Sequence, residues 1–308
     1  MIKTSHLRKR YGKKLAVDDI SFEISTDKVT GFLGPNGAGK STTMRLMLGL
    51  DNGEGITTYD GKRLSEYTQP AQVVGILLEA KAFHPTRLAK RHLRVLAEAG
   101  GVSKTRVDEV LDMVGLRSEA KRRPGKFSLG MAQRLGIAAA ILGKPKYLIL
   151  DEPANGLDPE GVAWLRRFLS DYADEGNAVF VSSHLLSEIQ LMADNVVVIG
   201  KGKLITSTSI KELTSGSKHA SVFVRTEQLA KLEKSLQQAS LHFEKLDGGL
   251  KVGGTTTDKI GKLAYAAGVP VLELADRNAS LEDIFLELTE GAEEFHSQVS
   301  EIQKGGSS

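Results

Sequence analysis

Cysteine is absent from the 308-residue sequence, which excludes disulfides, thiolate metal sites and a cysteine nucleophile. No apolar run approaches the ~20 residues that a membrane-spanning helix needs. Residues 1–15 are basic but contain no apolar core, so they do not read as a signal peptide. If this chain acts at a membrane, we therefore expect it to dock on the transmembrane segments of another protein.

Neither sign of charge dominates the chain. There are 41 Lys and Arg residues against 38 Asp and Glu residues, and the formal net charge is +3. This balance gives no argument for a nucleic-acid partner. Hydrophobic residues make up 41% and charged residues 26% of the sequence, as in a globular protein with room for one large domain and one small domain.

Short apolar runs alternate with segments of helical periodicity. Residues 20–24 alternate apolar and polar side chains, as a half-buried strand does, whereas residues 87–142 and 160–172 show mostly helical spacing. Residues 29–33 are typical of a buried strand, and two continuous apolar runs, residues 147–150 and 178–181, are typical of strands buried on both faces of a parallel sheet.

The amino-acid composition changes near residue 215, where a Thr-Ser-Gly-Ser run is typical of a linker. We expect a large domain over residues 1–215 and a small α+β accessory domain over residues 216–291. Residues 292–308 are polar and end in Gly-Gly-Ser-Ser, which predicts a flexible tail.

Residues 34–42 form a glycine-rich loop between a predicted strand and a predicted helix. They read Gly34-Pro35-Asn36-Gly37-Ala38-Gly39-Lys40-Ser41-Thr42 and fit the phosphate-loop pattern G-x-x-x-x-G-K-[ST]. Such a loop wraps phosphates with backbone N–H groups at the positive end of a helix. We expect Lys40 to reach the β- and γ-phosphates and the Ser41 hydroxyl to bind Mg²⁺. The alternative is a glycine-rich turn that binds nothing.

Two carboxylates follow the apolar run of residues 147–150. Asp151 is placed to hold Mg²⁺ through water, and Glu152 is placed to polarise an attacking water molecule. Because successive residues at a strand end point to different sides, the two carboxylates can take different roles. The alternative is an acidic loop after a core strand.

Together these motifs resemble the nucleotide-binding domain of ABC proteins over residues 1–215. The resemblance implies an α/β fold of the P-loop NTPase type, with a parallel core sheet, an antiparallel β subdomain and a helical subdomain. The small α+β C-terminal appendage would be additional to this domain.

The resemblance also assigns roles to residues that carry little signal alone. Tyr11 occupies the position of an aromatic side chain that stacks on adenine. Ser128 and Gly130 lie in the signature segment, where Leu129 and Met131 depart from the usual Leu-Ser-Gly-Gly-Gln, and would contact the γ-phosphate held by the opposite subunit. A simpler role for Ser128 is the N-cap of the following helix.

Three further positions complete the family pattern. Asp158 lies in the loop through which two subunits sense each other, and it is equally a plausible helix N-cap. His184 matches the switch histidine that orients the γ-phosphate and water. Glu79 stands where the family usually has a glutamine that accepts a hydrogen bond from metal-bound water.

The family implies a homodimer that sandwiches ATP and Mg²⁺, with each nucleotide between one subunit's phosphate loop and the other's Ser128 segment. It also implies a separate transmembrane permease, contacted by residues 81–96, and a cytoplasmic location on the inner face of the cell membrane. The departures at Glu79 and in the signature resemble the bacitracin-resistance and lantibiotic-immunity ATPases. They indicate an exporter of an antimicrobial peptide, an antibiotic or a lipid-like substrate.

Two rival functions remain open at this point. One rival is a soluble ABC-type ATPase that acts on ribosomes or DNA. The compact basic run at residues 121–126 is the feature that would support it. We interpret that run as a solvated turn and expect no nucleic-acid partner. A generic P-loop kinase is the weaker rival, because it gives no reason for Ser128, Asp158 and His184 at these spacings.

Overall fold

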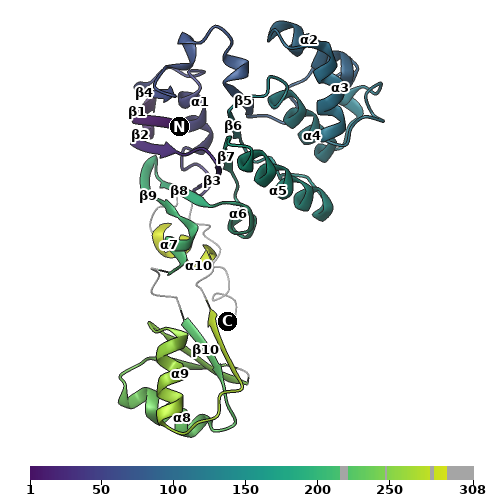
Figure 1. Cartoon of the computed structure of the whole chain (residues 1–308). Coiled ribbons are helices and arrows are strands. Elements are labelled where there is room, and N and C mark those ends of the chain that lie inside the picture. The colour runs from purple at the N-terminus through teal and green to yellow at the C-terminus, as the bar shows by residue number, and fades with distance from the viewer. Residues whose placement is uncertain (216–220, 247, 278–280, 290–308) are drawn as a thin grey trace, which may run out of the picture. The chain divides into compact units, whose positions relative to one another are not determined.

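The computed structural model describes residues 1–215, 221–246, 248–277 and 281–289 (Figure 1). It divides into two compact units, of which the first holds Met1–Ser207 and Thr289 among the described residues and the second holds Thr208–Leu288. The division at Ser207 precedes the boundary expected at residue 215. The expected tail at residues 292–308 lies outside the described residues.

A six-stranded sheet forms the centre of the first unit, in the order β5-β6-β7-β3-β8-β9. The pairs β5–β6, β6–β7, β7–β3 and β3–β8 are parallel. Residues 147–150 and 178–181, predicted as buried parallel strands, form β6 and β7, and residues 29–33, predicted as a buried strand, form β3, so these predictions are confirmed. The strands are β3 (Lys28–Leu33), β5 (Val74–Leu77), β6 (Tyr147–Leu150), β7 (Ala178–Ser182), β8 (Asn195–Gly200) and β9 (Lys203–Ser209).

The parallel pairing brings three functional segments to one edge of this sheet. The phosphate loop follows β3, the acidic pair follows β6, and His184 follows β7, and these three strands are neighbours. Because the carboxyl ends of parallel strands meet at the same edge, side chains far apart in the sequence come close together there.

An antiparallel sheet packs beside the central one. Its order is β2-β1-β4, with β1 (Ile2–Tyr11), β2 (Lys14–Ile24) and β4 (Glu54–Tyr59). Phe22 of β2 lies 5.6 Å from Phe180 of β7 and 6.0 Å from Phe32 of β3, measured between ring centroids, and all three rings are buried. This aromatic contact fixes the antiparallel sheet on the parallel one, and the antiparallel β subdomain implied by the family is confirmed.

Helices cover the sheets, and three of them form a separate group. In Figure 1, α2, α3 and α4 gather beside β5, and they correspond to the helical subdomain expected within residues 87–142. The helices of this unit are α1 (Lys40–Met47), α2 (Ala89–Ala99), α3 (Lys104–Met113), α4 (Leu129–Ala140), α5 (Pro159–Asp174) and α6 (Leu186–Met192). Short 3₁₀ turns occur at Leu64–Glu66, Pro70–Gln72 and Pro124–Lys126.

The second unit contains the element order β-α-β-β-α-β. Its antiparallel sheet has the order β11-β12-β10-β13, which is the ferredoxin-like arrangement. The α+β character predicted for the appendage is therefore observed. Its elements are α7 (Ile210–Ser215), β10 (Ser221–Arg225), α8 (Leu229–Gln238), β11 (Phe243–Leu246), β12 (Gly249–Gly253), α9 (Thr257–Ala266), β13 (Glu273–Arg277) and α10 (Leu281–Thr289).

The core of the second unit lies between its sheet and the helices α8 and α9. Val222 and Val224 of β10 pack with Leu232 of α8 and Ile260 of α9, and all four are fully buried. Across both units, the described helices include none that is long and apolar enough to cross a bilayer.

Candidate active site

The phosphate loop adopts a conformation that only glycine accommodates at two of its positions. Gly37 and Gly39 have φ values of 82° and 104°. A Cβ atom on Gly39 would lie 2.5 Å from the carbonyl oxygen of Ala16, so a side chain there would clash with the backbone of β2. The loop leads directly into α1, which begins at Lys40 and presents its free N–H groups to the loop.

Lys40 is buried beneath the loop. Its ammonium donates hydrogen bonds to the carbonyl oxygens of Gly34 at 2.6 Å and Pro35 at 3.4 Å. Burial lowers the pKa of the Lys40 amine, and the carboxylates of Glu152 and Asp151 partly offset this effect. A cation is therefore held by two backbone carbonyl groups beside the free N–H groups at the start of α1, which is an arrangement suited to a polyanion.

A chain of hydrogen bonds ties the loop to the acidic pair. The Ser41 hydroxyl donates to Asp151 Oδ2 at 2.6 Å, and the buried Ser182 hydroxyl donates to Asp151 Oδ1 at 2.5 Å. Ser182 in turn accepts a hydrogen bond of 2.9 Å from the backbone N–H of Glu152. A hydroxyl and a carboxylate side by side are oxygen donors of the kind that Mg²⁺ prefers, so the residues present fit this ion.

Glu152 has a positive φ of 50°, which is uncommon for a residue with a side chain. His184 lies next to it, with its Nδ1 atom 2.6 Å from Glu152 Oε2 and its backbone N–H donating to the same oxygen at 3.3 Å. The buried Gln133 side chain supports the turn by donating to the carbonyl oxygens of Glu152 and Asn155. Backbone strain held by its surroundings is typical of functional positions.

A cavity of about 440 Å³ opens over the phosphate loop and the acidic pair. It is lined by Tyr11, by the phosphate loop and by both Asp151 and Glu152, and its volume suits a ligand of nucleotide size. The structure therefore brings together Tyr11, Lys40, Ser41, Asp151 and Glu152, which the sequence assigned to adenine, phosphate, Mg²⁺ and the attacking water. Seven other expected site residues are absent from its lining: Gly34, Ala38, Glu79, Ser128, Gly130, Asp158 and His184.

Tyr11 is held at one end of the cavity by residues that the sequence did not reveal. Its hydroxyl donates to Asp51 Oδ2 at 2.9 Å, and Arg45 of α1 binds the same carboxylate through two nitrogens at 3.1 and 3.2 Å. The hydrogen bonds from Arg45 and Tyr11 hold the pKa of Asp51 below its usual range. Tyr11 is 49% exposed, with the Lys9 ammonium 4.8 Å from the centroid of its ring, and the uncovered part of the ring can accept a flat partner.

Ser128 and Asp158 are both N-caps. The Ser128 hydroxyl accepts from the backbone N–H of Met131 at 3.2 Å, and Asp158 Oδ1 accepts from that of Gly161 at 2.8 Å. The two caps are exposed, and their segments are in contact, because a Cβ atom on Gly130 would lie 3.0 Å from the carbonyl oxygen of Gly156. These residues form a second exposed cluster outside the cavity.

Glu79 is exposed and lines a neighbouring cavity with Phe83 and His92. Among the described residues, no group of three or more His, Asp or Glu side chains forms a metal site. The role of Glu79 as a third metal-associated group therefore stays a prediction.

Known families and proteins match both units of the chain. A family model described as ABC transporter matches residues 17–155, and a model described as a domain of unknown function (DUF8746) matches residues 220–282. The bacitracin transport ATP-binding protein BcrA of Bacillus licheniformis is 37% identical over 300 residues, which cover 94% of this chain and 98% of BcrA.

The lantibiotic transport ATP-binding protein SrtF of Streptococcus pyogenes is 38% identical over 206 residues, which cover 67% of this chain and 89% of SrtF. A solved structure, the ATP-binding subunit of an ABC transporter, is 25% identical with a TM-score of 0.64 and covers 70% of this chain and 92% of that one. Sequence, fold and site geometry agree, and the chain belongs to the ABC transporter family as an ATP-binding, ATP-hydrolysing subunit.

Proposed function

We propose that this chain powers a separate membrane permease that expels an antimicrobial peptide or antibiotic of the bacitracin or lantibiotic class. The observation that carries the ATPase part is the cluster of Ser41, Asp151, Glu152 and His184 beside the phosphate loop. BcrA and SrtF, which are named for bacitracin and lantibiotic transport, support the substrate class. Family membership favours this reading over an ATPase that acts on ribosomes or DNA.

In this proposal the phosphate loop binds the triphosphate of ATP. Its backbone N–H groups and the start of α1 hold the phosphate oxygens, and Lys40 exchanges its two carbonyl partners for the β- and γ-phosphates. Ser41 and Asp151 hold Mg²⁺, with Glu79 as a further acceptor. The ion neutralises charge on the phosphates when it is bound.

Glu152 is the general base. Its carboxylate accepts a proton from the attacking water, and its position is fixed by the backbone bond to Ser182 and by contact with His184. His184 orients the same carboxylate and the γ-phosphate. Because phosphoryl transfer depends mainly on positioning and charge, a small set of fixed groups of this kind is sufficient.

A second copy of the chain completes the site. Ser128, Gly130 and Asp158 do not line the cavity of their own chain, yet Ser128 and Asp158 are exposed caps at helix N-termini, which favour anions. In a homodimer in which each Ser128 segment faces the partner's phosphate loop, these residues would contact the γ-phosphate of the ATP that the partner holds. Loss of the γ-phosphate would then release the two copies.

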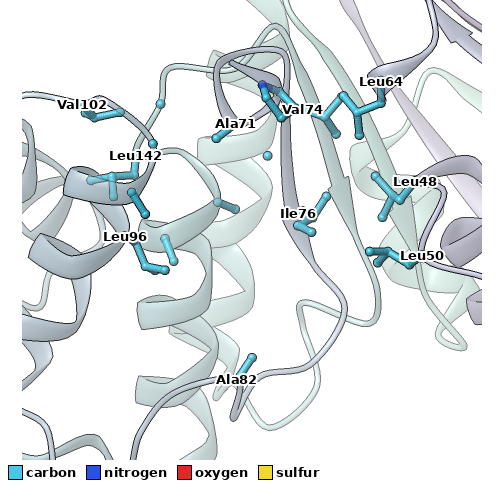
Figure 2. Close-up of a pocket in the computed structure, with 17 residues that line it drawn as sticks. Leu48, Leu50, Leu64, Ala71, Val74, Ile76, Ala82, Leu96, Val102 and Leu142 are labelled. Atoms are coloured by element: carbon cyan, nitrogen blue, oxygen red, sulfur yellow. The ribbon is translucent and has the colours of Figure 1, made fainter. Parts of the chain in front are cut away.

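The permease is proposed to dock beside β5, at an apolar cavity of about 520 Å³. Figure 2 shows the side chains that line it. Ile76 of β5 and Leu50 line one side of it and Leu96 of α2 the other. Ala82, at the start of the segment expected to face the permease, also lines this cavity. A chain held in this way would lie on the cytoplasmic face of the cell membrane.

Replacing the proposed base tests the catalytic assignment. The Glu152→Gln chain should bind ATP with unchanged affinity, but its turnover should fall by at least roughly 100-fold, because an amide cannot accept the proton. Phosphate release and nucleotide binding are measured on the purified chain. Glu160→Gln, an exposed position at the start of α5, serves as the control, and near-normal turnover in Glu152→Gln would remove Glu152 from this role.

The proposed stacking of adenine on Tyr11 is tested by comparing the binding of ATP with that of a ligand that has phosphates but no base. Tyr11→Ala should weaken ATP binding by roughly tenfold, since base stacking on an aromatic ring contributes about 1–3 kcal/mol, and should leave inorganic tripolyphosphate binding unchanged. Tyr11→Phe keeps the ring but loses the hydrogen bond to Asp51, so its affinity for ATP should lie between those of the unaltered chain and Tyr11→Ala. Tyr265→Ala, 88% exposed in the second unit, is the control. An equal loss for both ligands would make Tyr11 a structural residue.

Function in the cell is tested with a chain that cannot hold ATP. Native cells that carry Lys40→Ala should become more sensitive to bacitracin or to a lantibiotic, and the unaltered chain should still copurify with a multi-span membrane protein in mild detergent. Unchanged sensitivity, with copurification of ribosomes in place of a membrane protein, would contradict the transport function.

A further inference from the structure

The basic run at residues 121–126 has no part in the proposed ATP site, and the structure places it beside the start of α2. The backbone N–H of Ala89 donates to the carbonyl oxygen of Arg122 at 2.9 Å, and that of Gly125 donates to Pro85 at 3.2 Å. Two segments that are distant in the sequence therefore form one continuous surface of the helical subdomain.

This surface carries cations without acidic neighbours along the chain. Residues 80–97 and residues 120–150 contain neither Asp nor Glu. We call the following five side chains the basic face: Arg87, Arg91, Lys121, Arg123 and Lys126. All except the half-buried Arg87 are exposed.

The basic face also lacks ion-pair partners in three dimensions. Throughout the described part of the chain, no carboxylate pairs with any of its five side chains. The adjacent cations behave differently, because Lys90 pairs with Asp108 at 2.5 Å and Arg122 pairs with Glu119. Like charges left close together repel one another, so an unpaired cluster of this kind favours an anionic partner.

We propose that the basic face binds the anionic headgroups of the membrane surface. Clusters of four to eight Lys and Arg residues are the usual recognition element for anionic lipids. Leu88 lies within the same surface and is 39% exposed, and an apolar side chain among cations suits the boundary between headgroups and acyl chains. Binding of this kind would orient the ATPase against the bilayer.

Nucleic acid fits this surface less well. Single-stranded nucleic acid is bound by cations together with exposed aromatic rings on which bases stack. The aromatic residues of this region, Phe83 and Phe127, are half-buried and engaged, Phe83 with the ring of His92 and Phe127 with the guanidinium of Arg122. The surface offers charge and a leucine, as a lipid headgroup layer requires.

Lipid binding goes beyond the proposed function and does not depend on it. A permease would hold the chain through the apolar cavity beside β5 and through residues 81–96, which include Arg87 and Arg91. The basic face, completed by Lys121, Arg123 and Lys126 outside that segment, would act on the surrounding lipid. The purified chain should therefore bind vesicles that contain no permease, and it should do so whether or not ATP is turned over.

The test is cosedimentation of the full chain with vesicles of phosphatidylcholine alone or with about one-third phosphatidylglycerol. The chain should prefer the anionic vesicles at least tenfold, and added salt should weaken the binding. Arg91→Gln, Lys121→Gln and Arg123→Gln combined should lower the partition constant by roughly 100-fold. The control combines Lys28→Gln, Lys234→Gln and Lys259→Gln, which removes the same charge from other exposed positions and should keep most of the binding.

Thermal unfolding and ATP turnover without vesicles should be the same in all three proteins. Equal binding to both vesicle types, binding that salt does not weaken, or an equal loss in the control would each overturn the proposal. The salt titration needs only the unaltered chain, so it decides even if the triple variant fails to fold. A labelled oligonucleotide that binds the basic face while anionic vesicles do not would make it a nucleic-acid surface instead.

Discussion

The parallel pairing of β3, β6 and β7 is the constraint on which the rest of the site depends. Each strand ends at the same edge and delivers one component, namely the phosphate loop, the acidic pair and His184. Because the strands are buried on both faces, their register is set by apolar packing and not by the polar residues that follow them. The chemistry is thus carried by loops whose geometry the core dictates.

Polar contacts at this edge convert that placement into a precise arrangement. Asp151 accepts one hydrogen bond from the Ser41 hydroxyl and another from the Ser182 hydroxyl, so both of its carboxylate oxygens are fixed before any ligand binds. Glu152 follows in a strained conformation held by Gln133 and Ser182. A preorganised site of this kind avoids the cost of ordering its groups at the moment of reaction.

Local patterns predicted the parts of the molecule that depend on neighbouring residues. The apolar runs that became β3, β6 and β7, and the loop before α1, could be read directly because strand burial and loop sequence are local signals. The contact of Tyr11 with Asp51 could not be predicted, since it joins residues 40 positions apart through tertiary packing. Strands β11 and β13 also escaped prediction, because they carry charged residues at the positions that would mark an apolar run.

The central claim is that two copies of the chain together form each ATP site, and a mixing experiment tests it most directly. Ser128→Asp keeps a good helix cap but places a negative charge against the partner's phosphate, while Lys40→Ala disables the loop. Each protein alone should be inactive. Mixed together, they can form one intact site per heterodimer, so phosphate release should return. A mixture that stays inactive, or full activity in Ser128→Asp alone, would contradict the account.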